Sequence, residues 1–414
     1  MSQVTDYFIF NIEDLIFYLI RINFRISLKA LYRTKYSIFN FKYSIRSLSF
    51  PKVTHFKYLR ANRKILRTLF HRITHWEAWP FKLLYAPIAP VWLWYIIRSG
   101  GVWFFTPSNP RLTFGGMEGE PKKEMYDLLP PELYPTTFNV MPDQGIDSIN
   151  AMLKQHNIDY PFIVKPEVGG QGILFRKIDN PEELRHYHSK VPVEYIVQRM
   201  VLYPVEVSIF YIRHPQDAKG IVTGFLHKIP LQVIGDGKHT LEELIAQHPK
   251  GNKRIGELHS KHKESWDKVL PEGQRYILSY AANHNRGAHF VDLKEQIDDK
   301  LVSIFDKISH DINDFFYGRY DIMCESIADL KNSEHFTILE YNGCGAEPNH
   351  FYDTGYTLFG AYREILRHWK ALFRISRYNS GQGIKPWALG RGRKFLKETR
   401  RLYKVMREAD RDIG

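Results

Sequence analysis

The sequence of 414 residues has very little cysteine and no long uninterrupted apolar run. Two cysteines, Cys324 and Cys344, exclude a disulfide scaffold and a metal site built from several thiolates, so we expect a reducing compartment. We find no internal repeat and no long low-complexity linker. The hydrophobic content of 44% is ample for one large or two medium globular domains.

Positive charge is concentrated at the two ends of the sequence. The net charge is +13, and residues 1–75 hold 14 lysines and arginines against 3 acidic residues. Residues 367–414 hold 14 against 4, so the central part of the chain is net negative. An acidic centre with two basic ends indicates an anionic partner, either a nucleic acid or an anionic membrane surface.

The aromatic segment of residues 76–107 favours the membrane over nucleic acid. It is rich in Trp and Tyr, but prolines interrupt it and its longest apolar run is too short to span a bilayer. Aromatic side chains beside basic ones are typical of the lipid headgroup boundary, where we expect residues 92–95 to insert. We therefore predict a cytoplasmic protein that binds the inner face of the membrane peripherally. Burial against the enzyme core or against a second subunit of a homodimer is the alternative.

Helix-like and strand-like patterns alternate from about residue 140 onward. Neighbouring antiparallel strands are expected where two strand-like stretches follow each other directly, so the pattern predicts an α+β fold with antiparallel sheet. Basic helices are expected in residues 1–75 and in the tail of residues 367–414. A capping box of Thr240 and Glu243 predicts one helix start. Helices are expected over 145–158, 180–190 and 240–248, and strands over 161–166, 194–201, 205–214, 220–235, 317–326 and 335–343.

The stretch FIVKPEVGGQG, residues 162–172, joins a strand-like run to a glycine-rich loop. Glycines let backbone N–H groups approach an anion closely, and a lysine at the strand end adds a positive charge. This pattern is typical of a loop that holds nucleotide phosphates. An ordinary strand–loop turn is the alternative.

Two strand-like stretches near the end of the sequence carry carboxylates. Arg319 and Asp321 in GRYDIM are two residues apart, and Glu340 and Asn342 in ILEYNG repeat that spacing. Because alternate residues of a strand share a face, each pair should emerge on one side of a sheet. Two carboxylates and an amide oxygen form a site suited to Mg²⁺, with Mn²⁺ as the alternative ion.

Together these motifs resemble the ATP-grasp superfamily of carboxylate–amine ligases over roughly residues 120–360. The stretch GRYDIM…ILEYNGCGAEP resembles the metal elements of D-alanine–D-alanine ligases. The stretches VIGDGKHTLEELI and NHNRGAHFVDL resemble the ATP-grasp half of cyanophycin synthetase. The resemblance implies an ATP-grasp fold over residues 108–366, in which two α+β subdomains clamp ATP. The ending NGCGAEP and the N-terminal 110 residues depart from the ligases, which leaves the substrate half unassigned.

The resemblance also implies roles for individual residues. Arg319 and Lys228 would face the transferred phosphate. Arg286 is the candidate for a substrate carboxylate or phosphate, since a guanidinium suits bidentate contacts. The Mg²⁺ ligands would be Asp321, Glu340 and Asn342, and ATP would contact Lys122, Lys165, Gly169, Gly170, Gly172, Gln198, Arg199, Val201 and Glu206.

The implied reaction is a ligation in two steps. A carboxylate attacks the γ-phosphate of ATP to give ADP and an acyl phosphate, and an amine then displaces the phosphate. No covalent nucleophile on the protein is needed, so both cysteines are expected to be buried or in loops. Neither substrate is identified, although a membrane location suggests a lipid-linked or cell-envelope precursor. The alternatives are an ATP-grasp small-molecule kinase and a non-catalytic ATP-binding protein at the membrane.

Overall fold

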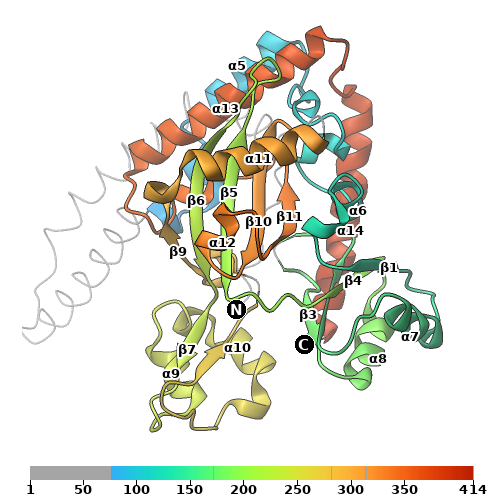
Figure 1. Cartoon of the computed structure of the whole chain (residues 1–414), viewed down its shortest axis with the longest axis vertical. Coiled ribbons are helices and arrows are strands. Elements are labelled where there is room, and N and C mark those ends of the chain that lie inside the picture. Colours follow the sequence, from blue (N-terminus) through green and yellow to red (C-terminus); the bar gives the residue numbers. More distant parts are fainter. Residues whose placement is uncertain (1–75, 171, 281, 313–314, 414) are drawn as a thin grey trace, which may run out of the picture. The chain divides into compact units, whose positions relative to one another are not determined.

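The computed structural model describes residues 76–170, 172–280, 282–312 and 315–413 (Figure 1). The helices expected within residues 1–75 lie outside the described residues. The chain divides into two compact units between Pro87 and Ile88. The described part of the first unit contains η2 (Trp76–Ala78) and α4 (Phe81–Tyr85), where the rings of Phe81 and Tyr85 stack 4.0 Å apart.

The second unit contains a four-stranded sheet in which every neighbouring pair is antiparallel. Its strand order is β1 (Thr137–Val140), β4 (Tyr195–Arg199), β2 (Phe162–Pro166) and β3 (Arg176–Ile178). Helices α7 (Ile146–Gln155) and α8 (Pro181–Lys190) contribute apolar side chains to its core. Asn180 caps α8 by accepting a hydrogen bond from the backbone N–H of Glu183.

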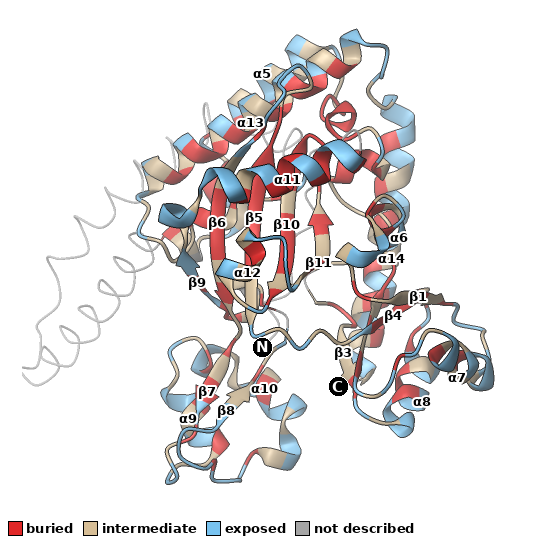
Figure 2. Ribbon diagram, viewed as in Figure 1, coloured by how far each residue is buried: buried red, intermediate tan, exposed pale blue. Residues whose placement is uncertain are grey.

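A five-stranded antiparallel sheet provides the largest core. Its order is β11 (Phe336–Asn342), β10 (Tyr317–Cys324), β5 (Val205–Ile212), β6 (Ile221–Ile229) and β9 (His289–Asp292). Figure 1 shows α11 (Asp299–Ile312) lying across β5, β6 and β10. In Figure 2 these strands are mostly buried and the outer side of α11 is exposed, as expected for an amphipathic covering helix. Side chains from α13 (Leu358–Gly381) pack on the opposite face, where the Phe210 and His368 rings lie 4.5 Å apart.

A small two-stranded sheet forms a third core. It pairs β7 (Gln232–Ile234) with β8 (Arg275–Ile277), next to α9 (Leu241–Gln247) and α10 (Ile255–Lys261). The capping box is present, since Thr240 and Glu243 each bond the other's backbone. The strand expected over residues 220–235 is instead two strands, β6 and β7, because Pro230 between them has no N–H for a ladder.

The basic C-terminal region consists of the second half of α13 and of α14 (Leu389–Ile413). The expected boundary between residues 366 and 367 therefore falls inside a continuous helix. Helix α14 places Tyr403, Met406 and Ala409 in the core of the four-stranded sheet. This basic helix is thus part of the globular structure.

Helix α5 (Ala89–Ser99) carries Trp92 and Trp94 of the aromatic segment. Trp92 is only 5% exposed, and its ring lies 4.9 Å from the rings of Phe104 and Trp369. The expectation that Trp92 inserts into lipid is therefore wrong, because protein aromatics already surround it. Trp94 and Ile97 are 55% and 64% exposed. Within the described ranges, no helix combines the length and apolarity required to cross a membrane.

The remaining described helices are short and connect the sheets. They are η3 (Thr106–Ser108), η4 (Thr113–Gly116), α6 (Lys122–Tyr126), η5 (Pro131–Leu133), η6 (Asn252–Arg254), η7 (Lys263–Ser265), η8 (His284–Arg286), η9 (Lys294–Gln296), α12 (Ile327–Lys331) and η10 (Asn349–Phe351).

Candidate active site

A cavity of about 490 Å³ is lined by residues of both large sheets. It receives side chains from β2 and β4 of the four-stranded sheet and from β5, β6, β10 and β11 of the five-stranded sheet. All predicted site residues line this cavity except Arg286, Arg319 and Asn342. The lining residues among the predictions are Lys122, Lys165, Gly169, Gly170, Gly172, Gln198, Arg199, Val201, Glu206, Lys228, Asp321 and Glu340.

The predicted metal ligands lie on paired strands. In the antiparallel register of β10 and β11, Asp321 is directly opposite Glu340 and Arg319 is directly opposite Asn342. Opposed residues of such a pair point to the same side, so the spacing of two on each strand brings all four side chains together. A register irregularity follows Asp321, between it and Ile322.

Asp321 is the centre of a polar network. Its carboxylate accepts hydrogen bonds from the Arg319 guanidinium at 3.3 Å and from the Asn342 amide at 3.2 Å. The Lys228 ammonium lies 3.2 Å away. Burial would raise the pKa of Asp321, but the charges of Arg319 and Lys228 outweigh it and hold the pKa below its usual range. This carboxylate is therefore ionised at neutral pH.

Lys228 connects Asp321 to Glu206. It is 4% exposed, and its ammonium lies 2.5 Å from the Glu206 carboxylate. Burial would lower the pKa of Lys228, but the two carboxylates outweigh burial and raise it, which keeps the side chain charged. Burial raises the pKa of Glu206, although Lys228 opposes this effect. Glu206 was expected to bind ribose, and here its carboxylate lines the cavity while paired with Lys228.

Two further lysines reach the cavity, Lys122 from helix α6 and Lys165 from β2 of the four-stranded sheet. The Lys122 ammonium donates to the Gly169 carbonyl at 3.1 Å, and the Lys165 ammonium donates to the Tyr126 hydroxyl at 3.4 Å. Burial lowers the pKa of Lys165, against the attraction of Glu340. These partners are neutral oxygens, so a bound anion would add a charge that these contacts do not supply.

The glycine loop lies beside these lysines and leaves little space for side chains. Gly172 has a φ of 71°, which is strained for any residue with a Cβ atom. A Cβ atom at Gly169 would lie 3.3 Å from Pro166, tighter than an ordinary van der Waals contact. The loop therefore presents mainly backbone to the cavity, as a phosphate-binding loop requires.

The residues expected at the adenine hinge lie at the end of β4. Gln198 donates to the Tyr126 hydroxyl at 2.8 Å and to Thr137 Oγ1 at 2.9 Å, and the Arg199 guanidinium donates to the Asn157 carbonyl at 2.9 Å. Val201 follows the end of the strand and also lines the cavity. Since the side chains of Gln198 and Arg199 bond to protein groups, contact with a base would come mainly from the backbone here.

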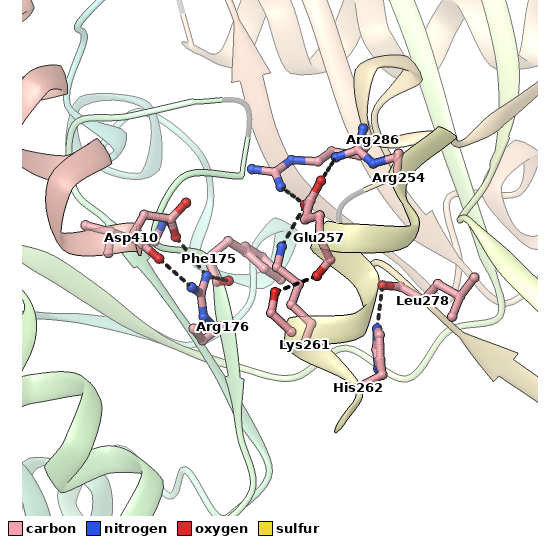
Figure 3. Close-up of polar contacts among 11 residues, drawn as sticks. Phe175, Arg176, Arg254, Glu257, Lys261, His262, Leu278, Arg286 and Asp410 are labelled. Atoms are coloured by element: carbon pink, nitrogen blue, oxygen red, sulfur yellow. Dashed lines mark hydrogen bonds and ion pairs between the residues drawn. The ribbon is translucent and has the colours of Figure 1, made fainter. Parts of the chain in front are cut away.

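Arg286 lies outside the lining, in a charged cluster drawn in Figure 3. Its guanidinium is 2.9 Å from the Glu257 carboxylate, which Arg254 and Lys261 also contact at 2.6 and 3.0 Å. Burial raises the pKa of Glu257, but these three cations outweigh it and lower the pKa to about 2. Three cationic side chains thus gather around Glu257. Arg286 lies three residues after Asn283 and four after Ala282, both of which line the cavity.

Sequence reasoning missed Tyr126, whose hydroxyl contacts both Lys165 and Gln198. The sequence indicates a site role for Tyr126 only through its position four residues after Lys122, which places both residues on the same face of a short helix. Also missed were Glu118 and Glu120, for each of which burial raises the pKa to about 7. The glycine-rich context of these two acids gives no sign that they are buried.

The oxygen donors fit a hard divalent cation such as Mg²⁺. Among the residues that the structure describes, the Glu340 carboxylate has no hydrogen-bond or ion-pair partner, although it lines the cavity opposite Asp321. Mg²⁺ prefers carboxylate oxygens as protein ligands, and here two opposed strands present them to one cavity. Asp321 and Glu340 are therefore suitable first ligands. Asn342 lies beside this pair, where its side-chain amide donates to Asp321 at 3.2 Å.

Comparison with known proteins gives a partial match. No family model matches the chain. Over 209 residues it is 25% identical to the glutathione biosynthesis bifunctional protein GshAB of Streptococcus thermophilus (strain CNRZ 1066). The match covers 44% of this chain but only 26% of that relative, so the chain spans about a quarter of the curated relatives it matches.

Solved structures with a similar arrangement include a bifunctional glutathione synthetase from Pasteurella multocida, with 15% identity and a TM-score of 0.33 over 59% of this chain and 36% of the other. The D-alanine–D-alanine ligase from Bacillus anthracis has 11% identity and a TM-score of 0.35 over 63% of this chain and 68% of the other. Because these TM-scores are low, the sheet order and the cavity carry the structural argument. The α+β fold with antiparallel sheets that the motifs predict is confirmed, and the chain is similar over part of its length to these synthetases and ligases.

Proposed function

We propose that this protein is an ATP-dependent ligase that activates a carboxylate as an acyl phosphate and joins it to an amine. The observation that carries the proposal is the convergence of two sets of groups on one cavity. One set is the pair of lysines beside the glycine loop, and the other is the opposed pair Asp321 and Glu340. Cations for phosphates beside paired carboxylates are what phosphoryl transfer from a nucleotide requires.

In the first step, the transfer of the γ-phosphate to the carboxylate, different residues of the chain would have different roles. Lys122 and Lys165 would bind phosphate oxygens, and Arg319 would stabilise charge that develops on the transferred group. Mg²⁺, when bound by Asp321, Glu340 and Asn342, would neutralise phosphate charge and orient the oxygens. The narrow glycine loop would exclude water, which otherwise hydrolyses an acyl phosphate.

We infer that Lys228 changes partners when the nucleotide binds. It is buried and paired with two carboxylates, Glu206 and Asp321. A cation bound by Asp321 would repel the Lys228 ammonium, while a phosphate in the cavity would attract it. Glu206 would then be available for a ribose hydroxyl, in agreement with its predicted role.

We infer that the carboxylate substrate binds beside the positive cluster of Arg286, Arg254 and Lys261. Arg176 on β3 also lies close enough to lower the pKa of Lys261, although burial is the larger cause. Excess positive charge a few residues from the cavity lining favours an anionic substrate. The exposed apolar side chains of α5 further support peripheral association with an anionic membrane surface, where a lipid-linked or envelope precursor would be available.

Hydroxylamine trapping tests the ligase proposal. Hydroxylamine converts an acyl phosphate to a hydroxamate, so purified protein with Mg²⁺, ATP and a pool of carboxylates should form hydroxamate and ADP together. ADP without hydroxamate, together with a phosphorylated hydroxyl compound, would identify a kinase instead. No ATP turnover with any amino acid, dipeptide or lipid extract would contradict an enzymatic role.

A further inference from the structure

Three buried side chains form a cluster outside the active-site cavity. His350 lies in η10, and Glu364 and His368 lie in α13, which packs on one face of the five-stranded sheet. None of the three lines the cavity, and none has a role in the proposed reaction. His350 and His368 are 4% and 0% exposed.

The cluster has the geometry of a ligand set. Glu364 and His368 are four residues apart on α13, so both emerge on the same face of the helix. Glu364 Oε1 lies 3.1 Å from His368 Nε2 and 3.4 Å from His350 Nε2. The three potential ligand atoms all lie within 4.8 Å of one another.

His350 lacks the hydrogen bonds that a buried imidazole needs. Within the part of the chain that the structure describes, neither of its ring nitrogens has a hydrogen-bond partner. A neutral imidazole has one donor and one acceptor nitrogen, and leaving both without partners in the interior is costly. The ring also packs tightly on Gly224 of β6, where an added Cβ atom would lie 2.2 Å from Nδ1. Its position is therefore fixed toward Glu364.

We propose that His350, Glu364 and His368 bind a divalent transition-metal ion, with Zn²⁺ as the best match. Zn²⁺ prefers imidazole nitrogen and carboxylate oxygen at about 2.0–2.1 Å, and tetrahedral bonds of that length separate two ligand atoms by roughly 3.3 Å. The two separations around Glu364 Oε1, 3.1 and 3.4 Å, are close to that spacing. A metal ion bound to His350 Nε2 would also give this nitrogen the partner that its 3.4 Å approach to Glu364 does not supply as a hydrogen bond.

The surroundings of the cluster support a structural role for this ion. The Tyr317 hydroxyl lies 3.4 Å from His368 Nδ1, where it can hold the ring with Nε2 toward the metal. The ion would join α13 to η10, which follows β11 along the chain. Between β11 and η10 lies Glu347, whose carbonyl accepts a hydrogen bond from Arg319 at 3.2 Å. The metal would thus stabilise the segment that supports the active-site arginine.

Metal binding by the full-length protein tests this proposal. The protein is treated with a chelator, dialysed, and titrated with Co²⁺ and then Zn²⁺ in excess Mg²⁺, which keeps the active-site carboxylates occupied. We expect about one equivalent of Co²⁺ with the intense visible absorption of a low-symmetry nitrogen–oxygen site, displaced by Zn²⁺. His350→Ala, His368→Ala and Glu364→Gln should each abolish that absorption. His335→Ala is the control, because His335 lies near Asp329 and Glu334 in an exposed cluster.

The wild-type result decides the proposal even if a variant does not fold. If the wild-type protein binds no Co²⁺ or Zn²⁺ stoichiometrically, the cluster is a hydrogen-bonded packing network and the proposal is wrong. Retention of the absorption by Glu364→Gln and both histidine variants would also contradict it. Thermal unfolding gives a second readout: Zn²⁺ should raise the Tm of the wild type and leave that of folded Glu364→Gln unchanged. Both readouts are independent of ATP turnover, so failure of the ligase proposal would not affect them.

Discussion

The ammonium of Lys228 lies 3.2 Å from the carboxylate of Asp321, in the interior of the cavity wall. The lysine therefore occupies one side of a carboxylate that is also the best metal ligand of the site. The pairing keeps Asp321 ionised before a metal ion binds. Lys228 then competes with the metal ion for the Asp321 carboxylate. Metal affinity should consequently depend on whether a phosphate is present to attract Lys228 away.

The first prediction concerns the metal carboxylates. Asp321→Asn and Glu340→Gln should each reduce Mg²⁺-dependent ATP turnover by about 100-fold or more, because an amide offers one neutral oxygen in place of a charged pair. ATP hydrolysis is measured at saturating Mg²⁺, and circular dichroism checks the fold. Asp311→Asn on the outer side of α11 is the control. Wild-type turnover in both active-site variants would refute the metal assignment.

The second prediction concerns Lys165. Among the described residues its ammonium hydrogen-bonds to the Tyr126 hydroxyl alone, at 3.4 Å, so Lys165→Ala should raise the KM for ATP by about tenfold and lower kcat as well. Initial rates over a range of ATP concentrations measure both constants. Lys154→Ala on the exposed side of α7 should behave as wild type. A change confined to the KM of the second substrate would be inconsistent with a phosphate-binding role.

The third prediction concerns Arg286. Arg286→Gln should raise the KM for the carboxylate substrate by about tenfold, since it removes a charged hydrogen bond, and should leave ADP affinity unchanged. Calorimetric titration with ADP separates the two effects. Because Glu257 keeps Arg254 and Lys261 as partners, the fold should tolerate the change. Weaker ADP binding with an unchanged substrate KM would place Arg286 in the nucleotide site instead.

The fourth prediction concerns the pH dependence of stability at Glu120. Burial raises its pKa from 4.5 to about 7, with repulsion by Glu340 and Glu118 contributing. The native state therefore binds more protons than the unfolded state between these values, and this group lowers stability as pH rises through that window. Glu120→Gln should be more stable than the wild type at pH 8, by on the order of 2 kcal/mol, and equally stable near pH 4.5.

Urea unfolding at both pH values measures this difference. The matched control is Glu132→Gln, which makes the same substitution at an exposed carboxylate in η5. A stability difference that does not change between the two pH values would mean that Glu120 is ionised in both states.

The fifth prediction concerns membrane binding by α5. Trp94 and Ile97 are more than half exposed, whereas Trp92 is buried, so the first two should supply any apolar contact with lipid. The protein should float with anionic liposomes at low salt and persist with them in part at high salt, because salt screens charge but not apolar burial. Trp94→Ser with Ile97→Ser should abolish the salt-resistant fraction. Ile221→Ser on β6 is the control, and a wild type that ignores liposomes at every salt concentration would contradict the proposal.

The sequence was sufficient to predict those parts of the site that depend on strand periodicity. Arg319 and Asp321, like Glu340 and Asn342, share a face because of a spacing of two, and antiparallel pairing of neighbouring strands then brings the pairs together. The glycine loop was predictable for a similar reason, since its residues are consecutive. Both features depend on short-range rules.

The features that could not be predicted depend on contacts between distant segments. Tyr403, Met406 and Ala409 pack into the core of the four-stranded sheet, but the same apolar spacing would suit a basic helix on a membrane. Trp92 and Trp94 are two residues apart in one aromatic run, yet one is buried and the other is exposed. Only the position of α13 relative to α5 distinguishes them. Of the two partners of Lys228, Glu206 lies on a strand that was predicted as its neighbour, whereas Asp321 lies 93 residues later, on a strand that the sequence does not place beside it.

The packing of α14 on the four-stranded sheet has a consequence for protein synthesis. A ribosome completes β1 through β4 long before it makes Tyr403 and Met406, so the nascent sheet lacks part of its apolar core during translation. An incomplete core exposes apolar surface and attracts chaperones. The ribosome makes the glycine-loop half of the cavity before the other half. We nevertheless expect it to complete its folding last, because its core needs side chains of α14. Nascent chains stalled before α14 should therefore bind ADP far more weakly than released ones.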